Sequence, residues 1–268
     1  MKADVLVAEI GSTTTLINAF CGIRSGEPKF IGQGQAPTSV LEGDVRIGLN
    51  GAIEDLKANL GADKIEYGEM LATSSAAGGL RMCVHGLVYD MTVKAAEAAA
   101  LGAGAIVTMA TAGKLSEYDI EDLKEAKPNL ILLAGGTDYG EKETALFNAR
   151  MIAASGVKAP VIYAGNVQNK RAVEDIFQKA GISCTVTENV YPKLDKLNIE
   201  PARKIIHQVF EEHIIKAPGM EHIRDMVTGH IMPTPGAVME AVQLAYNEIG
   251  DVVAVDIGGA TTDVHSVT

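Results

Sequence analysis

The chain has 268 residues, of which 47% are hydrophobic and 21% charged, and a formal net charge of −11. This composition is typical of a globular α/β protein and excludes fibrous and disordered classes. The acidic excess argues against nucleic-acid binding, because that affinity depends on lysine and arginine neutralising phosphates. The longest uncharged stretch, residues 98–113, is shorter than the roughly 20 residues of a membrane span. We therefore expect neither a nucleic acid nor a membrane as partner.

The three cysteines, Cys21, Cys83 and Cys184, are far apart and form no C-x-x-C pair. Their odd number and spacing suggest neither a disulfide framework nor a thiolate metal site. The N-terminal sequence also lacks the basic start and long apolar core of a signal peptide. We therefore expect a cytoplasmic protein.

The first hundred residues predict an antiparallel start followed by a helix and a further strand. Apolar runs bounded by glycine turns predict strands, here at residues 4–10, 15–22 and 29–36. Apolar residues at near-helical spacing then predict a helix that ends at Gly61, a typical C-terminal cap. A strand at residues 68–75 and an alanine-rich helix at residues 92–101 follow.

After Gly102 the pattern changes to continuous apolar strands separated by amphipathic helices. This alternation predicts a parallel sheet covered by helices on both faces. The predicted strands are 105–110, 129–136, 159–166 and 183–189, and the predicted helices are 119–126, 141–154 and 171–179. From Glu200 the chain is predicted to be mainly helical, before a last hairpin at its end.

One short pattern occurs twice, near each end of the chain. "VLVAEIGSTTTL" begins at Val5, and "VVAVDIGGATTDV" begins at Val252. Aligning Glu9 with Asp256 also aligns Gly11 with Gly258 and Thr14 with Thr261. Each copy is a strand that ends in an acid, followed by a glycine turn and hydroxyl residues.

This pattern suits the binding of phosphate and magnesium. Glycine lets the backbone approach an anion closely, and the hydroxyls donate further hydrogen bonds. An acid at the strand end can hold Mg²⁺, which keeps several of its waters and needs few carboxylates. Either hairpin alone is equally well explained as a tight β-turn. The repetition favours two loops that clamp a triphosphate between them.

The two loops resemble those of the actin, heat-shock-protein and sugar-kinase ATPase superfamily, "EIGSTTT" the first and "DIGGATTD" the second. Within it, "AEIGSTTTLINAF", "LATSSAAGGLRMCVHGL", "LLAGGTDYGEKETALFNARMIA" and "VDIGGATTDVHSV" resemble the MutL-type family encoded beside glutamate mutase, which is unrelated to the mismatch-repair protein of that name. The resemblance covers essentially the whole chain. It implies a reactivating ATPase that releases damaged cofactor from an adenosylcobalamin-dependent mutase of the glutamate mutase or aminomutase type.

The resemblance also implies a fold, cofactors and site residues. The fold class is α/β, an actin-like (ribonuclease H-like) ATPase lobe at residues 1–101 with an inserted parallel α/β region at 102–190. A helical return at 191–249 and the first hairpin of a truncated second lobe at 250–268 follow. ATP and Mg²⁺ are the implied cofactors, with Glu9 and Asp256 at the metal and Asp256 also placing the attacking water. The implied phosphate-binding residues are Gly11, Ser12, Thr13, Thr14, Gly258, Gly259, Ala260, Thr261, Thr262 and Asp263.

Two departures from the superfamily pattern bear on activity. Glu9 stands where the first loop normally has aspartate, and its extra methylene moves the carboxylate by about 1.5 Å. That shift disturbs a near-octahedral magnesium shell and argues against efficient hydrolysis. The superfamily also has a second lobe after the second loop, so we expect a fragment that binds nucleotide weakly or not at all by itself.

Two other functions remain open from the residues. One is a small-molecule kinase of the same fold, with Asp256 as the candidate substrate base. The other is a non-hydrolysing scaffold whose region 102–189 binds the partner directly.

Weaker motifs favour structural explanations. "LLAGGTDYGEKE" places a glycine turn before a helix, and we predict that Thr137 or Asp138 caps that helix. "TSSAAGG", from Thr73, reads as a plain loop. "TMATAGKL" fails as a Walker loop because Thr108 replaces the first glycine. His207 and His213 are six residues apart, which does not fit two zinc ligands on one helix face.

Overall fold

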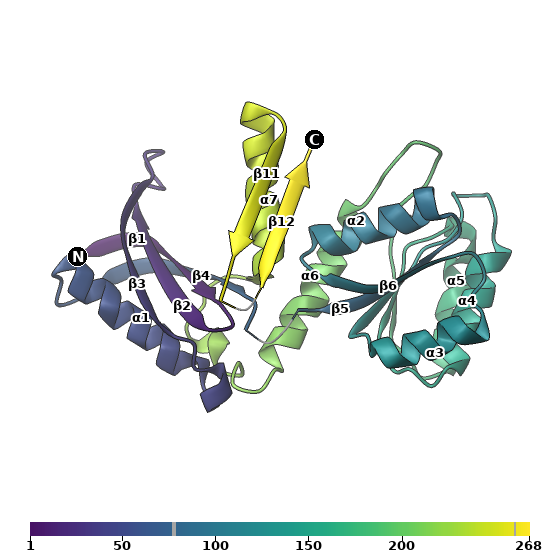
Figure 1. Ribbon diagram of the computed structural model, residues 1–268, viewed down its shortest axis with the longest axis horizontal. Coiled ribbons are helices and arrows are strands. Elements are labelled where there is room, and N and C mark those ends of the chain that lie inside the picture. The colour runs from purple at the N-terminus through teal and green to yellow at the C-terminus, as the bar shows by residue number, and fades with distance from the viewer. Residues whose placement is uncertain (77–78, 260) are drawn as a thin grey trace. The chain divides into compact units, whose positions relative to one another are not determined.

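The computed structural model describes residues 1–76, 79–259 and 261–268, and the chain forms two compact units (Figure 1). One unit comprises Met1–Gly79 with Val209–Thr268, and the other comprises Leu80–Gln208. The units therefore divide at residue 80, whereas the sequence places the start of the inserted region at residue 102. The reason is strand β5 (Arg81–Gly86), which pairs within the parallel sheet of the second unit.

The first unit is built on a five-stranded sheet in the order β10-β4-β1-β2-β3. β1 and β2 pair antiparallel, as do β2 and β3, while β4 runs parallel to both β1 and β10. This is the ribonuclease H-like arrangement, so the predicted fold class is confirmed. The strands are β1 (Lys2–Ile10), β2 (Thr14–Cys21), β3 (Lys29–Pro37), β4 (Glu66–Ser74) and β10 (Ile231–Pro233).

Helix α1 (Val45–Leu60) packs on one face of this sheet and decides which side chains lie on the other. A Cβ on Gly34 of β3 would overlap the carbonyl oxygen of Ala52 in α1, so the helix approaches the strand at its backbone. Through the strand registers, Ala8 and Ile17 share this covered face with Gly34. Because side chains alternate along a strand, Glu9 lies on the opposite face.

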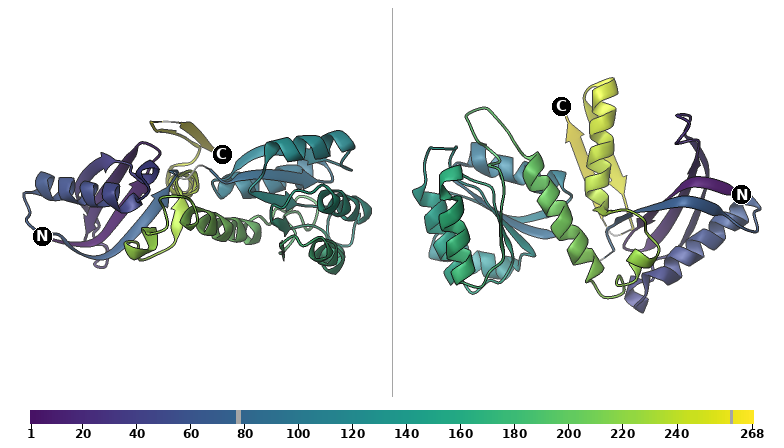
Figure 2. Two further views of the ribbon diagram at one scale, coloured as in Figure 1. Left: turned by 90° about the horizontal axis from the view of Figure 1, so that it is seen from below. Right: turned by 180° about the vertical axis from the view of Figure 1, so that it is seen from behind.

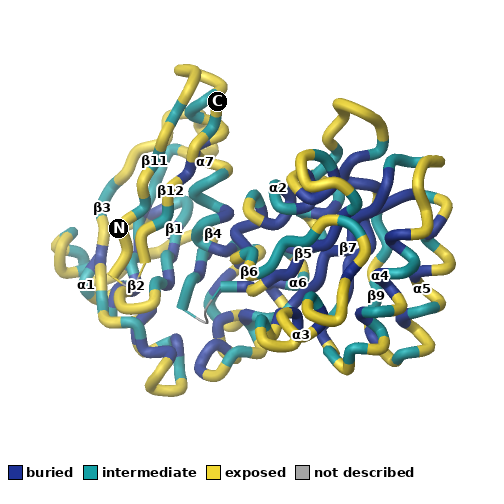
Figure 3. Tube along the Cα trace, turned by 45° about the vertical axis from the view of Figure 1, so that its right-hand side comes forward, coloured by how far each residue is buried: buried dark blue, intermediate teal, exposed yellow. Residues whose placement is uncertain are grey.

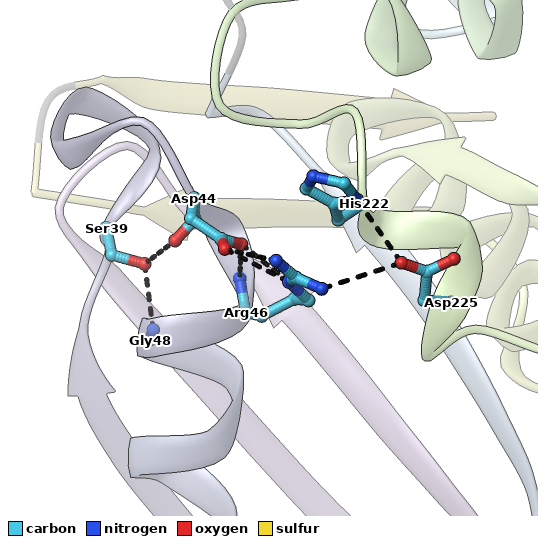
Figure 4. A network of polar contacts seen from close by, with 6 residues as sticks. All are labelled: Ser39, Asp44, Arg46, Gly48, His222 and Asp225. Atoms are coloured by element: carbon cyan, nitrogen blue, oxygen red, sulfur yellow. Dashed lines mark hydrogen bonds and ion pairs between the residues drawn. The ribbon is translucent and has the colours of Figure 1, made fainter.

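Both ends of α1 are capped, and a polar network fixes its N-terminus (Figure 4). Asp44 accepts a hydrogen bond from the Arg46 backbone and further ones from its guanidinium. These hydrogen bonds hold the pKa of the Asp44 carboxyl at about 2. Arg46 also pairs with Asp225, which in turn lies 3.3 Å from His222. At the other end Gly61 has φ 60°, as the sequence predicts for a cap.

The last part of the first unit is a separate hairpin with a helix against it. β11 (Val252–Ile257) and β12 (Thr262–Val267) pair only with each other, and α7 (Thr234–Ile249) packs on one face of the hairpin (Figures 1 and 2). Val253, Val255 and Val264 lie on the other face and are exposed, which gives the alternating colours of β11 in Figure 3.

The second unit is a fully parallel sheet in the order β6-β5-β7-β8-β9. Its strands besides β5 are β6 (Ile106–Ala112), β7 (Leu130–Leu133), β8 (Val161–Tyr163) and β9 (Cys184–Val186). Its helices are α2 (Lys94–Gly102), α3 (Glu117–Ala126), α4 (Glu143–Ala154) and α5 (Lys170–Lys179), and α6 (Glu200–Ile215) continues into the first unit. The predicted alternation of strands and helices is confirmed.

The main core cluster of the second unit is aliphatic apart from Cys83 and two large aromatic side chains. β7 is buried along its whole length (Figure 3), and Phe177 and Tyr163 fill the space between the sheet and its helices. Among the described residues, every helix is too short or too polar to span a bilayer.

His85, near the end of β5, is a buried polar exception in this core. Its Nδ1 lies 2.7 Å from the Thr111 hydroxyl, and its Nε2 has no hydrogen-bond partner among the described residues. Burial lowers the pKa of the imidazole to about 4, and the nearby negative charge of Asp119 offsets only part of that effect. The folded unit therefore holds His85 neutral.

This burial predicts an acid-sensitive second unit. As the pH is lowered from 6.5 to about 4, the unfolded chain takes up a proton at His85 and the folded chain does not. The free energy of unfolding therefore decreases as the pH decreases, by on the order of 3 kcal/mol in total. Measured by urea denaturation, His85→Gln should lose less of its free energy of unfolding over this pH range than the parent chain does. Gln178→Ala, at an exposed position of α5 whose side chain does not titrate, serves as control. Equal pH dependence in the parent and His85→Gln would contradict the prediction.

Candidate functional site

The two repeated motifs fold into hairpin loops with the same closure. In the first loop (residues 11–14), the Gly11 N–H donates to the Thr14 carbonyl over 3.0 Å. In the second loop (residues 258–261), the Gly258 N–H donates to the Thr261 carbonyl over 2.9 Å. The sequence alignment of the two motifs therefore matches their backbone geometry. Ala260, a predicted phosphate-binding residue, lies outside the described residues.

The two loops lie against each other within the first unit. A Cβ built on Gly259 would be 3.2 Å from the Cβ of Thr13 and would overlap the Thr13 hydroxyl. A side chain at 259 would therefore require the Thr13 side chain to shift. Residues about 246 positions apart in sequence share one site as a result, although the strands that carry them belong to different sheets.

The acids that precede the loops are also neighbours. Burial raises the pKa of the Glu9 carboxyl, and the negative charge of Asp256 raises it further. Both side chains are half-buried. Two carboxylates that repel each other in a partly buried place favour a proton or a cation between them.

The remaining predicted residues surround this acid pair. Thr262 and Asp263 begin β12, and Asp263 lies directly opposite Asp256 in the strand register. Ser12, Thr13, Thr14 and Thr261 are exposed. The N–H groups of Ser12, Thr13 and Gly259 donate to no described residue, so these backbone donors are free for an anion or water.

Two residues that the sequence analysis did not single out support the first loop. Thr38, just after β3, donates its hydroxyl to the Gly11 carbonyl over 2.8 Å, and its N–H donates to the Thr13 carbonyl. Ser75 donates its N–H to the Ile10 carbonyl and its own carbonyl lies 3.5 Å from the Ser12 hydroxyl. Ser75, in the stretch read as a plain loop, thus borders the site, and Ala77 and Gly78 of that stretch lie outside the described residues. No local signal identifies Thr38, because its contacts come from strand pairing.

The glycine turn after β7 is organised differently from the prediction. Neither Thr137 nor Asp138 caps α4, whose first turn is capped by Glu141 accepting from the Thr144 N–H over 2.8 Å. Asp138 instead accepts from the Val167 N–H at the start of the next helical segment. The cap prediction was wrong because the helix begins later, at Glu143, and the turn packs against neighbouring loops.

The residues present fit a magnesium–polyphosphate group. The described residues include no cluster of three or more His, Cys, Asp or Glu that could hold a metal ion by themselves. Glu9 and Asp256 supply two carboxylates, and Mg²⁺ is typically bound by one or two carboxylates together with waters and substrate phosphates. The N–H groups of Ser12, Thr13 and Gly259, unpaired among the described residues, are the backbone donors available to a phosphate.

Comparison with known proteins assigns the family. The family model described as MutL protein matches residues 5–268. The chain belongs to the MutL family. A curated member, Protein MutL of Clostridium tetanomorphum, is 46% identical over 235 residues, which cover 85% of this chain and 51% of that protein. This MutL-family chain thus spans about half the length of that relative.

Among solved structures, the MutL-family chain is similar to the nucleotide-free acetone carboxylase from a study of ATP-dependent acetone carboxylation. The identity is 19% and the TM-score 0.40, with 99% of this chain and 44% of that chain covered.

The contact between the loops can be tested by cross-linking. In Thr13→Cys combined with Gly259→Cys, the Cβ separation of 3.2 Å is close to the roughly 3.5–4.5 Å of a disulfide, so mild oxidation should join the two positions. Peptide mapping by mass spectrometry separates this bond from any made by the three native cysteines. Ser25→Cys with Gly259→Cys is the control, since Ser25 lies beyond the far end of β2. Equal cross-linking in both pairs would contradict the contact.

The raised pKa of Glu9 predicts a pH-dependent stabilisation in Glu9→Gln. A carboxyl whose pKa is raised by folding stabilises the folded state below its ordinary value of 4.5 and loses that contribution as pH rises. Glu9→Gln should therefore raise the free energy of unfolding at neutral pH, and the gain should shrink toward pH 4.5. Chemical denaturation at both pH values measures it, with the exposed Glu42→Gln as control. A loss of stability at neutral pH in Glu9→Gln would refute the effect.

Proposed function

We propose that this chain is the nucleotide-binding part of a MutL-type reactivating factor that binds ATP with Mg²⁺. The observation that carries the proposal is the approach of the two matched loops, with Thr13 against Gly259 and the Glu9 carboxyl beside Asp256. Backbone donors that are unpaired among the described residues and exposed hydroxyls from both loops are thereby brought close together. Membership of the MutL family supports the same reading.

In this proposal each loop binds part of the polyphosphate. Ser12, Thr13 and Thr14 donate from the first loop, and Gly259, Thr261 and Thr262 donate from the second, whereas the Gly258 N–H closes the second loop on the Thr261 carbonyl. Asp256 and Glu9 orient the water shell of the cation, and Asp256 also places the attacking water. Bound Mg²⁺ neutralises phosphate charge, and the two carboxylates relieve their mutual repulsion on binding it. The longer Glu9 side chain favours binding over fast hydrolysis.

The partner in this proposal is an adenosylcobalamin-dependent mutase of the glutamate mutase or aminomutase type. Nucleotide binding can change the affinity for the mutase only if the nucleotide-bound and nucleotide-free states bind the mutase with different affinities. Closure of the loops on ATP provides two such states. Release of damaged cofactor from the mutase is the proposed outcome.

Calorimetry tests nucleotide binding. Titration of MgATP should give saturable heat, and Asp256→Asn should weaken the binding by about ten-fold or more, as loss of a ligand to the metal's waters typically does. Asp251→Asn, an exposed acid just before β11, should bind as the parent chain does. Because we expect this chain to bind nucleotide weakly, the titration is carried to high MgATP concentration. Equal affinity in Asp256→Asn and Asp251→Asn would refute the phosphate site.

The coupling is tested separately with the mutase. Binding of an adenosylcobalamin-dependent mutase is measured with and without MgATP, on the parent chain and on Asp256→Asn. The proposal expects the nucleotide to change the mutase affinity of the parent chain alone. If the nucleotide binds without changing the affinity for the mutase, the proposed phosphate site is retained and the proposed coupling is refuted.

A further inference from the structure

The second unit has a polar cavity at the carboxyl edge of its parallel sheet. The cavity holds about 320 Å³ and is lined by segments that follow β7, β8 and β9. In open α/β sheets, ligands bind outside the carboxyl ends of the strands. A volume of 320 Å³ lies at the small end of ligand pockets, so the occupant would be a small molecule.

Buried asparagines hold the loops around this cavity in one arrangement. Asn166 accepts from the Tyr139 and Gln168 N–H groups and donates to the carbonyls of Gly140 and Glu141. Its amide hydrogen-bonding capacity is thereby used on loop backbone. Asn189 likewise donates to the Gly136 carbonyl and to Asp138 Oδ1. The cavity wall is therefore fixed before any ligand arrives.

The two acids of the cavity wall each keep one oxygen free. Asp138 uses Oδ1 to accept from the Val167 N–H and from Asn189. Glu188 uses Oε2 to accept from Asn198. The second oxygen of each carboxylate accepts no hydrogen bond from a described residue, so both present an unused acceptor.

Two lysines of the same wall are also available. Neither Lys170 nor Lys196 forms an ion pair with a residue that the structure describes. Lys170 is the first residue of α5, where a cation is disfavoured by the helix dipole. Its position is therefore not explained by helix stability.

A second cavity in this unit has a structural explanation. It holds about 410 Å³ and is lined by Lys124, Lys127 and Lys158. It lies at the amino edge of the sheet, where α3 and α4 end. Lysines near helix C-termini offset the negative end of the helix dipole, so these cations need no ligand to account for them.

We propose that the cavity with both signs of charge binds a small zwitterion of the α-amino acid class. Lys170 and Lys196 receive its carboxylate, and the free oxygens of Asp138 and Glu188 receive its ammonium. The two positive and two negative side chains cancel, so a ligand with one charge of each sign satisfies both pairs. A polyphosphate would be repelled by the carboxylates of Asp138 and Glu188. This site does not rest on the proposed nucleotide function, which concerns the first unit.

The test titrates each of the common L-amino acids into the isotope-labelled chain without nucleotide. We expect at least one to shift the side-chain amide signals of Asn189 and Asn198 saturably in NMR spectra. Its N-acetyl form, which lacks the ammonium, and its amide form, which lacks the carboxylate, should each bind about ten-fold or more weakly, since a hydrogen bond to a charged group is worth about 1.5–3 kcal/mol.

Matched lysine variants locate the site. Lys196→Gln should weaken the same titration by about ten-fold, whereas Lys193→Gln, an exposed lysine of the same loop that does not line the cavity, should not. Lys170→Gln provides a second variant if Lys196→Gln misfolds. No saturable shift with any amino acid, equal binding of the N-acetyl form, or equal loss in Lys193→Gln would overturn the proposal.

Discussion

The like charges of Glu9 and Asp256 in one partly buried place are the constraint on which the first unit's site depends. Each acid is the second-last residue of its strand. Each strand runs directly into a glycine turn, so bringing the acids together also brings the turns together. Repulsion between the carboxylates costs stability in the protein alone. In the proposed function a bound cation would relieve that cost.

The fold places these acids through the register of its strands. α1 covers the face of the sheet that carries Ala8, and alternation leaves Glu9 on the other face. α7 covers one face of the β11–β12 hairpin, and Asp256 lies on the same face of that hairpin as His265 and Ala254. A shift of one residue in either strand would turn its acid to the wrong side.

In the second unit, hydrogen bonds from buried asparagines hold the loops at the carboxyl edge of the parallel sheet. Its central strands β7 and β8 are buried on both faces, so their carboxyl ends must be closed by loops whose backbone groups need partners. Asn166 and Asn189 supply those partners and hold the loops rigid. Rigid loops at a sheet edge let charged side chains keep fixed positions, and Asp138 holds its neighbouring loops through Oδ1 alone.

The sequence by itself determined the elements and the family. Glycine turns, apolar periodicity and the repeated motif predict the antiparallel start, α1 with its Gly61 cap, the alternating parallel region and the two loops, because these signals are local. The loop contact, Thr13 against Gly259, was expected only from the repetition. Tertiary structure alone decided that β5 belongs to the parallel sheet, that Thr38 and Ser75 brace the first loop, and that Asp138 caps a neighbouring helical segment. Each of these depends on pairing between residues distant in the chain, and no local pattern records which distant strand or loop a residue will meet.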